Sequence, residues 1–166
     1  VGRVAQAVFA YTAAGLIDVE QAGGMVTAET ASGSIQIGGA RGVRCESGVG
    51  SIRLKSVSGG VRAATAAGNV TVALTSGQSL ENSFLASGRG DVTVFVPSNL
   101  SVTVKALNET PSPAGRVLSE FPEIRRLPSP VGRRMGSVVA QGSLNGGGPV
   151  LMLSATGGAI SIKRQK

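Results

Sequence analysis

One short phrase recurs along this chain at an almost constant spacing, and it limits the folds that the chain can adopt. The phrase is a glycine and a variable residue, followed by an apolar, a polar and a second apolar residue. Intervals of 18, 17, 18 and 22 residues separate its first five copies. A period of this kind indicates a repeat architecture in which each unit packs on the next. The copies begin at Gly15, Gly33, Gly50, Gly68, Gly90 and, near the C-terminus, Gly158.

Within each copy the apolar residues alternate with polar ones, as in a β-strand with one buried face. The position between the two apolar columns is polar in every copy, for example Asp18, Gln36 and Arg53. These strands therefore have an inward and an outward face. The first inward column contains Ile17, Ile35, Ile52, Val70, Val92 and Ile160, and the second contains Val19, Ile37, Leu54, Val72, Val94 and Ile162.

A second strand of the same kind follows in several units. Thr27, Arg44 and Arg62 occupy one of its outward positions, and Glu29 and Glu46 occupy the next. One unit of about 18 residues thus contains two short strands and two turns, with glycine at corners where a residue without Cβ can adopt positive φ. The inward columns of this strand contain Val26, Val43, Val61 and Leu151, then Ala28, Cys45, Ala63 and Leu153.

We therefore predict an all-β fold, namely a β-solenoid or β-roll with coils of about 18 residues. A β-sandwich of hairpins is the alternative, because its short strands have a similar spacing. Hairpins give no reason for two strand types to alternate in strict turn, which favours the solenoid. The 25 glycines argue against a helical fold. The length suits a single domain over residues 1–166.

The segment from about residue 106 to 148 departs from the repeat and contains most of the prolines. Proline cannot donate a hydrogen bond to an interior ladder, so we expect a Pro-rich loop excursion from the coils here. We predict a strand around Arg116 to Phe121, a long exposed loop through Pro130, and a strand near Ser137 to Gln141. The repeat then resumes.

The composition excludes several kinds of site. The chain has no histidine and a single cysteine, Cys45. An internal disulfide, a Cys/His zinc site and a Ser–His triad are therefore impossible. We expect no cofactor and no metal, and we expect Cys45 to be a small core residue.

The net charge is +7, and a basic protein can bind nucleic acid. Lysine and arginine are spread along the chain, and no aromatic residues are interleaved with them for base stacking. We therefore expect a solvated basic face and no nucleic-acid partner. The one compact basic group contains Arg125, Arg126, Arg133 and Arg134.

An enzyme on such a scaffold would need paired carboxylates, and acidic residues are scarce. We expect Glu29 and Glu46 to lie one above the other on the same outward column, with Arg44 and Arg62 beside them. This stacked cluster and the compact basic group are the candidate interaction residues. The alternative interpretation of the cluster is a ladder of alternating charges that keeps the sheet face soluble.

Four features together resemble a bacterial adhesin-like family of β-strand-repeat domains: the recurring phrase, the two-strand unit, GRVLSEFP from Gly115, and GGGPVLMLSATGGAISIKR from Gly146. The similarity covers the chain from about Gly15 onward. It implies a right-handed β-solenoid that is exported or tethered at the cell envelope, in the periplasm or outside the cell. The family has no catalytic or ligand residues to carry over, and its function is largely uncharacterised.

No stretch of the chain is long enough to span a membrane, and no signal peptide is visible. The sequence pattern is already under way at Val1. An N-terminal leader or anchor, encoded upstream, is therefore a hypothesis that the residues before Val1 would test.

Three functions follow as hypotheses. The favoured one is a non-catalytic, envelope-associated binding, adhesin-like or scaffold module that presents a flat surface to an unknown protein or glycan. The second is a self-polymerising structural element, a homo-oligomer formed by end-to-end or face packing, because stacked coils leave open ladder edges. The third is a polysaccharide-active enzyme that uses Glu29 or Glu46. Because catalytic groups are lacking, we predict that the protein is not an enzyme.

Overall fold

The computed structural model describes residues 2–75, 81–109, 117–127 and 138–165, and every element in these residues is a β-strand. The prediction of an all-β fold is confirmed. The same residues contain no helix with the length and apolarity needed to cross a membrane. The strands are β1 (Arg3–Val4), β2 (Val8–Ala14), β3 (Ile17–Val19), β4 (Gln21–Ala22), β5 (Val26–Ser32), β6 (Ile35–Val49), β7 (Ile52–Ala67), β8 (Val70–Leu74), β9 (Ser83–Arg89), β10 (Val92–Pro97), β11 (Val102–Asn108), β12 (Val117–Ser119), β13 (Arg125–Leu127), β14 (Val138–Leu144), β15 (Val150–Ala155) and β16 (Ile160–Gln165).

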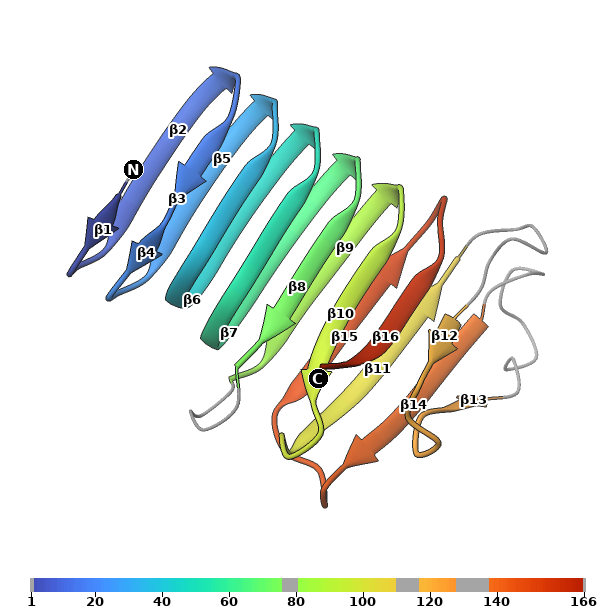
Figure 1. Ribbon diagram of the computed structural model, residues 1–166. Helices are drawn as coiled ribbons and strands as arrows, with labels where there is room; N and C mark the ends of the chain where they lie inside the picture. The colour runs from blue at the N-terminus through green and yellow to red at the C-terminus, as the bar shows by residue number, and fades with distance from the viewer. Residues whose placement is uncertain (1, 76–80, 110–116, 128–137, 166) are drawn as a thin grey trace.

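Equivalent strands of successive repeats lie side by side and run parallel. Ile35 pairs with Ile52, and Ile52 pairs with Val70, so the predicted inward column is continuous from one repeat to the next. All three side chains are fully buried. Figure 1 shows the arrangement, in which the chain runs back and forth between two facing layers of strands.

The two layers belong to one hydrogen-bonded sheet because β6 and β7 are long enough to run through both. Residues 35–37 of β6 pair with β3, whereas residues 43–49 pair with β5. We call the layer with β3 the first layer and the layer with β5 the second layer. The first continues through β8, β10, β16 and β12, and the second through β9, β15, β11, β14 and β13.

Aliphatic side chains from both layers fill the space between them and form a single buried cluster. In the second layer Ala28, Cys45 and Ala63 succeed one another in register, and all three are fully buried. The predicted inward columns are therefore confirmed. Small and β-branched residues suit this core because thin side chains let the two layers lie close together.

A third inward column of the second layer is polar and was not predicted from the sequence. The hydroxyl groups of Ser47, Thr65 and Ser87 are buried and each donates a hydrogen bond to the carbonyl of a corner glycine. The donor–acceptor distances are 3.1, 3.0 and 2.8 Å. Each hydroxyl thus satisfies a carbonyl oxygen that would otherwise lie at the edge of the core without a partner.

The corner glycines are required for two reasons. Gly50 has φ of +141°, and a Cβ added there would overlap the carbonyl oxygen of Gly33 in the preceding coil. Its N–H also donates to Ala67 O of the next coil at 2.8 Å. At Gly15 the φ of +116° is also positive, but a Cβ would meet open space. The close contact between stacked corners therefore requires glycine for a reason that is separate from the backbone conformation.

One coil precedes the first predicted repeat. β2 pairs in parallel with β5, with Val8 opposite Val26 and Ala10 opposite Ala28. The repeat therefore begins before Gly15, and the sequence contains the signal: VFAYTAAG from Val8 has the same alternation as VTAETASG from Val26.

The Pro-rich excursion contains more strand than predicted. The strand expected around 116–121 is β12, and the strand expected near 137–141 is β14. The prediction of a long exposed loop through Pro130 is wrong for residues 125–127, which form β13 and pair antiparallel with β14. These residues lie between Pro122 and Pro128 in the sequence, so their own N–H groups are available to a ladder.

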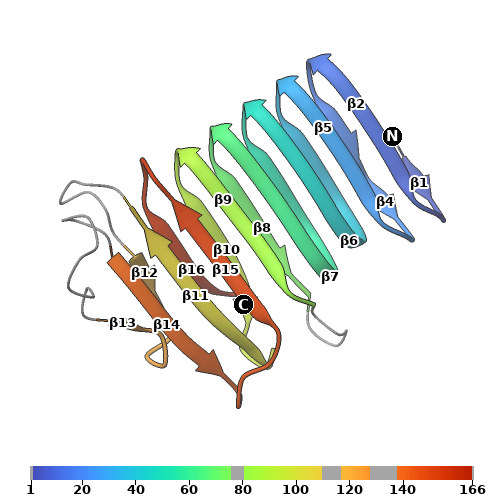
Figure 2. The same cartoon turned by 180° about the vertical axis from the view of Figure 1, so that it is seen from behind.

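The last repeat lies inside the sheet and not at its end. β15 lies between β9 and β11, and β16 lies between β10 and β12. The coil made by β11 and β12, although earlier in the chain, is therefore outside the C-terminal coil, as the view from behind in Figure 2 shows. β14 and β13 extend this end of the second layer with antiparallel pairs.

Replacing Gly50 by alanine is expected to destabilise the protein more than replacing Gly15 by alanine. Both changes place a side chain at positive φ, which costs about 1 to 2 kcal/mol. Only Gly50→Ala also forces two coils apart, so its total cost is expected to exceed about 3 kcal/mol. Urea unfolding followed by circular dichroism measures both, and equal losses would contradict the close stacking at the corner.

Burial raises the pKa of the Cys45 thiol from its ordinary value of 9.0 to about 12. Below pH 9 the thiol is protonated in both states and contributes no pH dependence. Between pH 9 and 12 it ionises only in the unfolded chain, so the free energy of unfolding falls as pH rises, by about 1.4 kcal/mol per pH unit. We expect this slope to be absent from Cys45→Ala. Thermal or urea unfolding of both proteins across this pH range measures the difference, and parallel pH profiles would refute it.

Candidate functional site

The predicted charged cluster is assembled on the outward face of the second layer. Glu29 of β5 pairs in register with Glu46 of β6, and Arg44 of β6 pairs in register with Arg62 of β7. Like charges therefore follow one another along the sheet. The basic and acidic columns lie beside each other, so charges alternate along β6 between Arg44 and Glu46, and the interpretation of the cluster as a charged ladder that keeps the sheet face soluble stays an alternative.

This arrangement has an energetic cost that acid–base pairing offsets only weakly. Like charges directly opposite one another on neighbouring strands destabilise a sheet. Arg44 Nη2 lies 3.9 Å from Glu46 Oε1, but the two side chains are 50% and 47% exposed, so the ion pair contributes little. On β7 the position equivalent to Glu46 is Ala64. Arg62 accordingly has no carboxylate within 4 Å among the residues that the structure describes.

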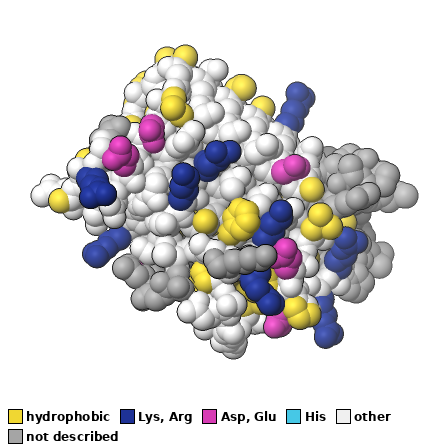
Figure 3. Space-filling view, viewed as in Figure 1, with side chains coloured by type: hydrophobic (Ala, Val, Ile, Leu, Met, Phe, Trp, Pro, Cys, Tyr) yellow, Lys and Arg dark blue, Asp and Glu magenta, His cyan; other side chains and the backbone are white. Residues whose placement is uncertain are grey.

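The compact basic group of the excursion lies elsewhere. Arg125 and Arg126 belong to β13, which four strands separate from β7 in the second layer. Arg126 Nη2 donates to Val117 O at 3.3 Å. Arg133 and Arg134 lie outside the described residues. On the face drawn in Figure 3, basic side chains form small groups beside acidic and hydrophobic ones instead of a continuous basic surface.

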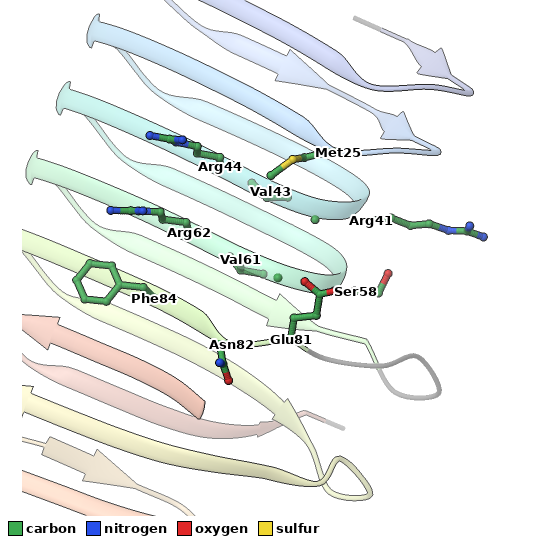
Figure 4. A pocket seen from close by; sticks show the side chains of 13 residues that line it. Met25, Arg41, Val43, Arg44, Ser58, Val61, Arg62, Glu81, Asn82 and Phe84 are labelled. Carbon is green, nitrogen blue, oxygen red and sulfur yellow. The ribbon is translucent and has the colours of Figure 1, made fainter. Parts of the chain in front are cut away.

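A shallow groove of about 720 Å³ opens beside Arg44 and Arg62, where β6 and β7 pass from the first layer to the second. Val43 and Val61 are buried and form part of its floor. Met25, which is half exposed, lines the groove as well. Figure 4 shows the two arginine side chains extending in the same direction from adjacent strands.

Glycine keeps this groove open. Gly42 and Gly59 have φ of +91° and +80°, and the pairing of β6 with β7 shifts register between residues 41 and 43. A Cβ at Gly42 would lie 3.8 Å from Met25 Cγ, and one at Gly60 would lie 3.3 Å from Glu81 Oε2. Larger residues at these positions would therefore fill the space between the flanking side chains.

Phe84 extends the line of the two arginines onto a third strand. It pairs in register with Arg62 across β7 and β9, and its ring is 37% exposed. We call Arg44, Arg62 and Phe84 the outward row. Phe84 was not predicted from the sequence because the longer interval before Gly90 hides the register. The signal is FLASGRG from Phe84, which matches RAATAAG from Arg62.

Hydrogen bonds hold the wall of the groove that carries Glu81. The N–H of Val61 donates to Ser83 Oγ at 3.1 Å, and the Ser83 hydroxyl donates to Glu81 O at 2.9 Å. The N–H of Val150 donates to Asn82 Oδ1 at 2.9 Å. Residues 81–83 are thus tied to β7 on one side and to β15 on the other. The groove has a defined shape although it is shallow.

The two carboxylates of the cluster do not line this groove. Glu29 borders a separate small depression of about 260 Å³ with Phe9 and Tyr11 of β2. Within residues 2–75, 81–109, 117–127 and 138–165, no group of three or more metal-ligating side chains is placed to hold an ion. The groove therefore offers guanidinium groups next to an aromatic ring and an aliphatic floor, with the carboxylate of Glu81 on one wall.

Comparison with models of known families, with curated proteins and with solved structures finds no match to this chain. The resemblance to the adhesin-like family accordingly stays a prediction.

Proposed function

We propose that this protein is a non-catalytic binding module of the bacterial cell envelope, and that its coils form a right-handed β-solenoid whose flat outward face contacts a partner. The envelope location, the export and the handedness come from the resemblance to the adhesin-like family. The partner is a protein or a glycan.

Strand pairing supports a solenoid over a sandwich of hairpins. Most strands pair in parallel with the strand one repeat further along the stack. Antiparallel pairs occur in the described residues only where β14 meets β11 and β13. Hairpins would join neighbouring strands in antiparallel pairs throughout.

The observation that carries the binding function is the outward row beside the groove. Arg44 and Arg62 are exposed and stacked in register, an arrangement that opposes folding unless something offsets their repulsion. An anionic partner would do so, because each guanidinium can bind a carboxylate or phosphate group through a pair of parallel hydrogen bonds.

Changing Arg62 to serine is expected to weaken binding of the purified protein to isolated cell envelopes by about tenfold. The variant loses one of the two aligned cations. The lost cation, Arg62, is the arginine that has no carboxylate within 4 Å among the described residues. The matched control is Arg53→Ser, an exposed arginine on the same strand but in the first layer. Co-sedimentation with envelopes of the encoding bacterium gives both affinities.

Wild-type protein that does not bind envelopes would refute the proposed function. An equal loss in Arg62→Ser and Arg53→Ser would refute the assignment of the site to the second layer. Unfolding midpoints of the variants, measured alongside, separate binding effects from folding effects.

One observation favours the second candidate function, self-association. Among the described residues β2 pairs only with β5, so its other edge is open. The N–H of Val8 donates to Met25 O at 2.9 Å, and backbone groups alternate between the two sides of a strand in a parallel ladder. The N–H groups of Phe9 and Tyr11 therefore point to the open edge, where a second copy could pair.

If β2 mediates self-association, Tyr11→Pro is expected to abolish it without loss of stability, because proline is tolerated where an edge N–H faces solvent. Tyr11→Ala is the control, since it removes the exposed ring but keeps the N–H. Sedimentation velocity at increasing concentration reports the oligomeric state. A wild-type protein that stays monomeric at every concentration would remove this candidate.

The third hypothesis, a polysaccharide-active enzyme, gains no specific observation. Glu29 and Glu46 lie outside the groove, on an exposed part of the sheet. Their use as catalytic acids stays a prediction from the sequence.

A further inference from the structure

The outward row runs across the strands of the second layer in one direction. Arg44, Arg62 and Phe84 lie on β6, β7 and β9, which are consecutive in the second layer. The row therefore crosses the strands at right angles to the chain direction, with about 4.8 Å between neighbouring positions. A ligand that contacts all three side chains has to be elongated and has to lie across the strands.

A ligand that binds both arginines has to carry anionic groups at successive positions along its length. The two arginine side chains extend in the same direction from adjacent strands, as Figure 4 shows. Arg44 has a weak contact with Glu46, and Arg62 has no carboxylate within 4 Å among the described residues. A small anion would meet only exposed side chains and would be held weakly. A polymer with regularly spaced anions would gain affinity from several contacts at once.

Phe84 indicates what lies beside the anions, at the end of the row next to Arg62. An exposed ring next to cations offers an apolar platform, and the C–H face of a sugar ring fits such a platform while its edge stays polar. Val43, Val61 and Met25 give the neighbouring groove an apolar lining for the same kind of face. Single-stranded nucleic acid would instead need several stacking aromatics, and the row has one.

We propose that the outward row binds an acidic polysaccharide of the polyuronate class. The glycan lies across β6, β7 and β9, with uronate carboxylates on Arg44 and Arg62 and a sugar ring on Phe84. The inference rests on the proposed function and deepens it, because it names the ligand class of the same site. No bond is made or broken, and the protein holds the polymer by charge-assisted hydrogen bonds and ring contact.

The test uses the full chain and three probes of similar length: polygalacturonate, neutral dextran and polyglutamate. In isothermal titration calorimetry we expect polygalacturonate to bind, with an affinity that falls as salt rises because exposed charges are screened. Dextran is expected not to bind, because it lacks carboxylates. Polyglutamate, which has carboxylates but no sugar rings, is expected to bind at least about tenfold more weakly than polygalacturonate.

Two variants and one control separate the contacts. Arg62→Ser and Phe84→Ser are each expected to weaken polygalacturonate binding by about tenfold, and Arg53→Ser by less than about twofold. Equal affinity for polygalacturonate and polyglutamate, together with no effect of Phe84→Ser, would show simple charge attraction and overturn the proposal. Envelope binding that depends on Arg62, without any polyuronate binding, would overturn the ligand class and leave the proposed function standing.

Discussion

The structure depends on the hydrogen-bonded register between glycine corners. Four corner glycines donate their N–H to the next coil: Gly15, Gly33, Gly50 and Gly68, for example Gly33 to Val49 O at 2.7 Å. A Cβ at Gly68 would overlap the carbonyl oxygen of the corner below it. Because the corners touch through backbone atoms alone, coils can succeed one another at the spacing of a β-ladder, and the aliphatic columns form without offset.

The same register determines what the surface can present. In a parallel sheet with one repeat per coil, residues at the same place in the repeat become neighbours in space. Arg44 and Arg62 are therefore aligned because they occupy equivalent positions in successive repeats. The groove arises where the repeat is imperfect. Gly42, Gly59 and Gly60 leave space at the turn, and Phe84 occupies the position that an arginine occupies in β6 and β7.

The polar column inside the second layer provides hydrogen-bond donors for the backbone carbonyls of the same corners. A tight corner directs a carbonyl oxygen toward the core, and a short hydroxyl side chain from the strand before the next corner reaches it. Asn108 has the same role in the outer coil, where its Nδ2 donates to Gly158 O at 2.8 Å. The longer amide reaches a corner that comes fifty residues later in the sequence, because the last repeat is inserted beside β11.

By itself the sequence determined the strand type, the inward columns and the stacking of Glu29 on Glu46 and of Arg44 on Arg62, because a repeat with a period of two inside it specifies both face and register. It missed the coil of β2, the polar column and Phe84, although each has a local signal in the alternation or beside the insertion. Only the tertiary structure decided the order of the coils, the place of β13, and the groove. The order of the coils and the place of β13 depend on which strand edge a distant segment meets, and the similar edges of a repeated ladder carry no mark in the sequence that distinguishes one from the next. The groove depends on the turn conformation of Gly42 and Gly59 and on the register shift between β6 and β7, which the repeat pattern does not specify.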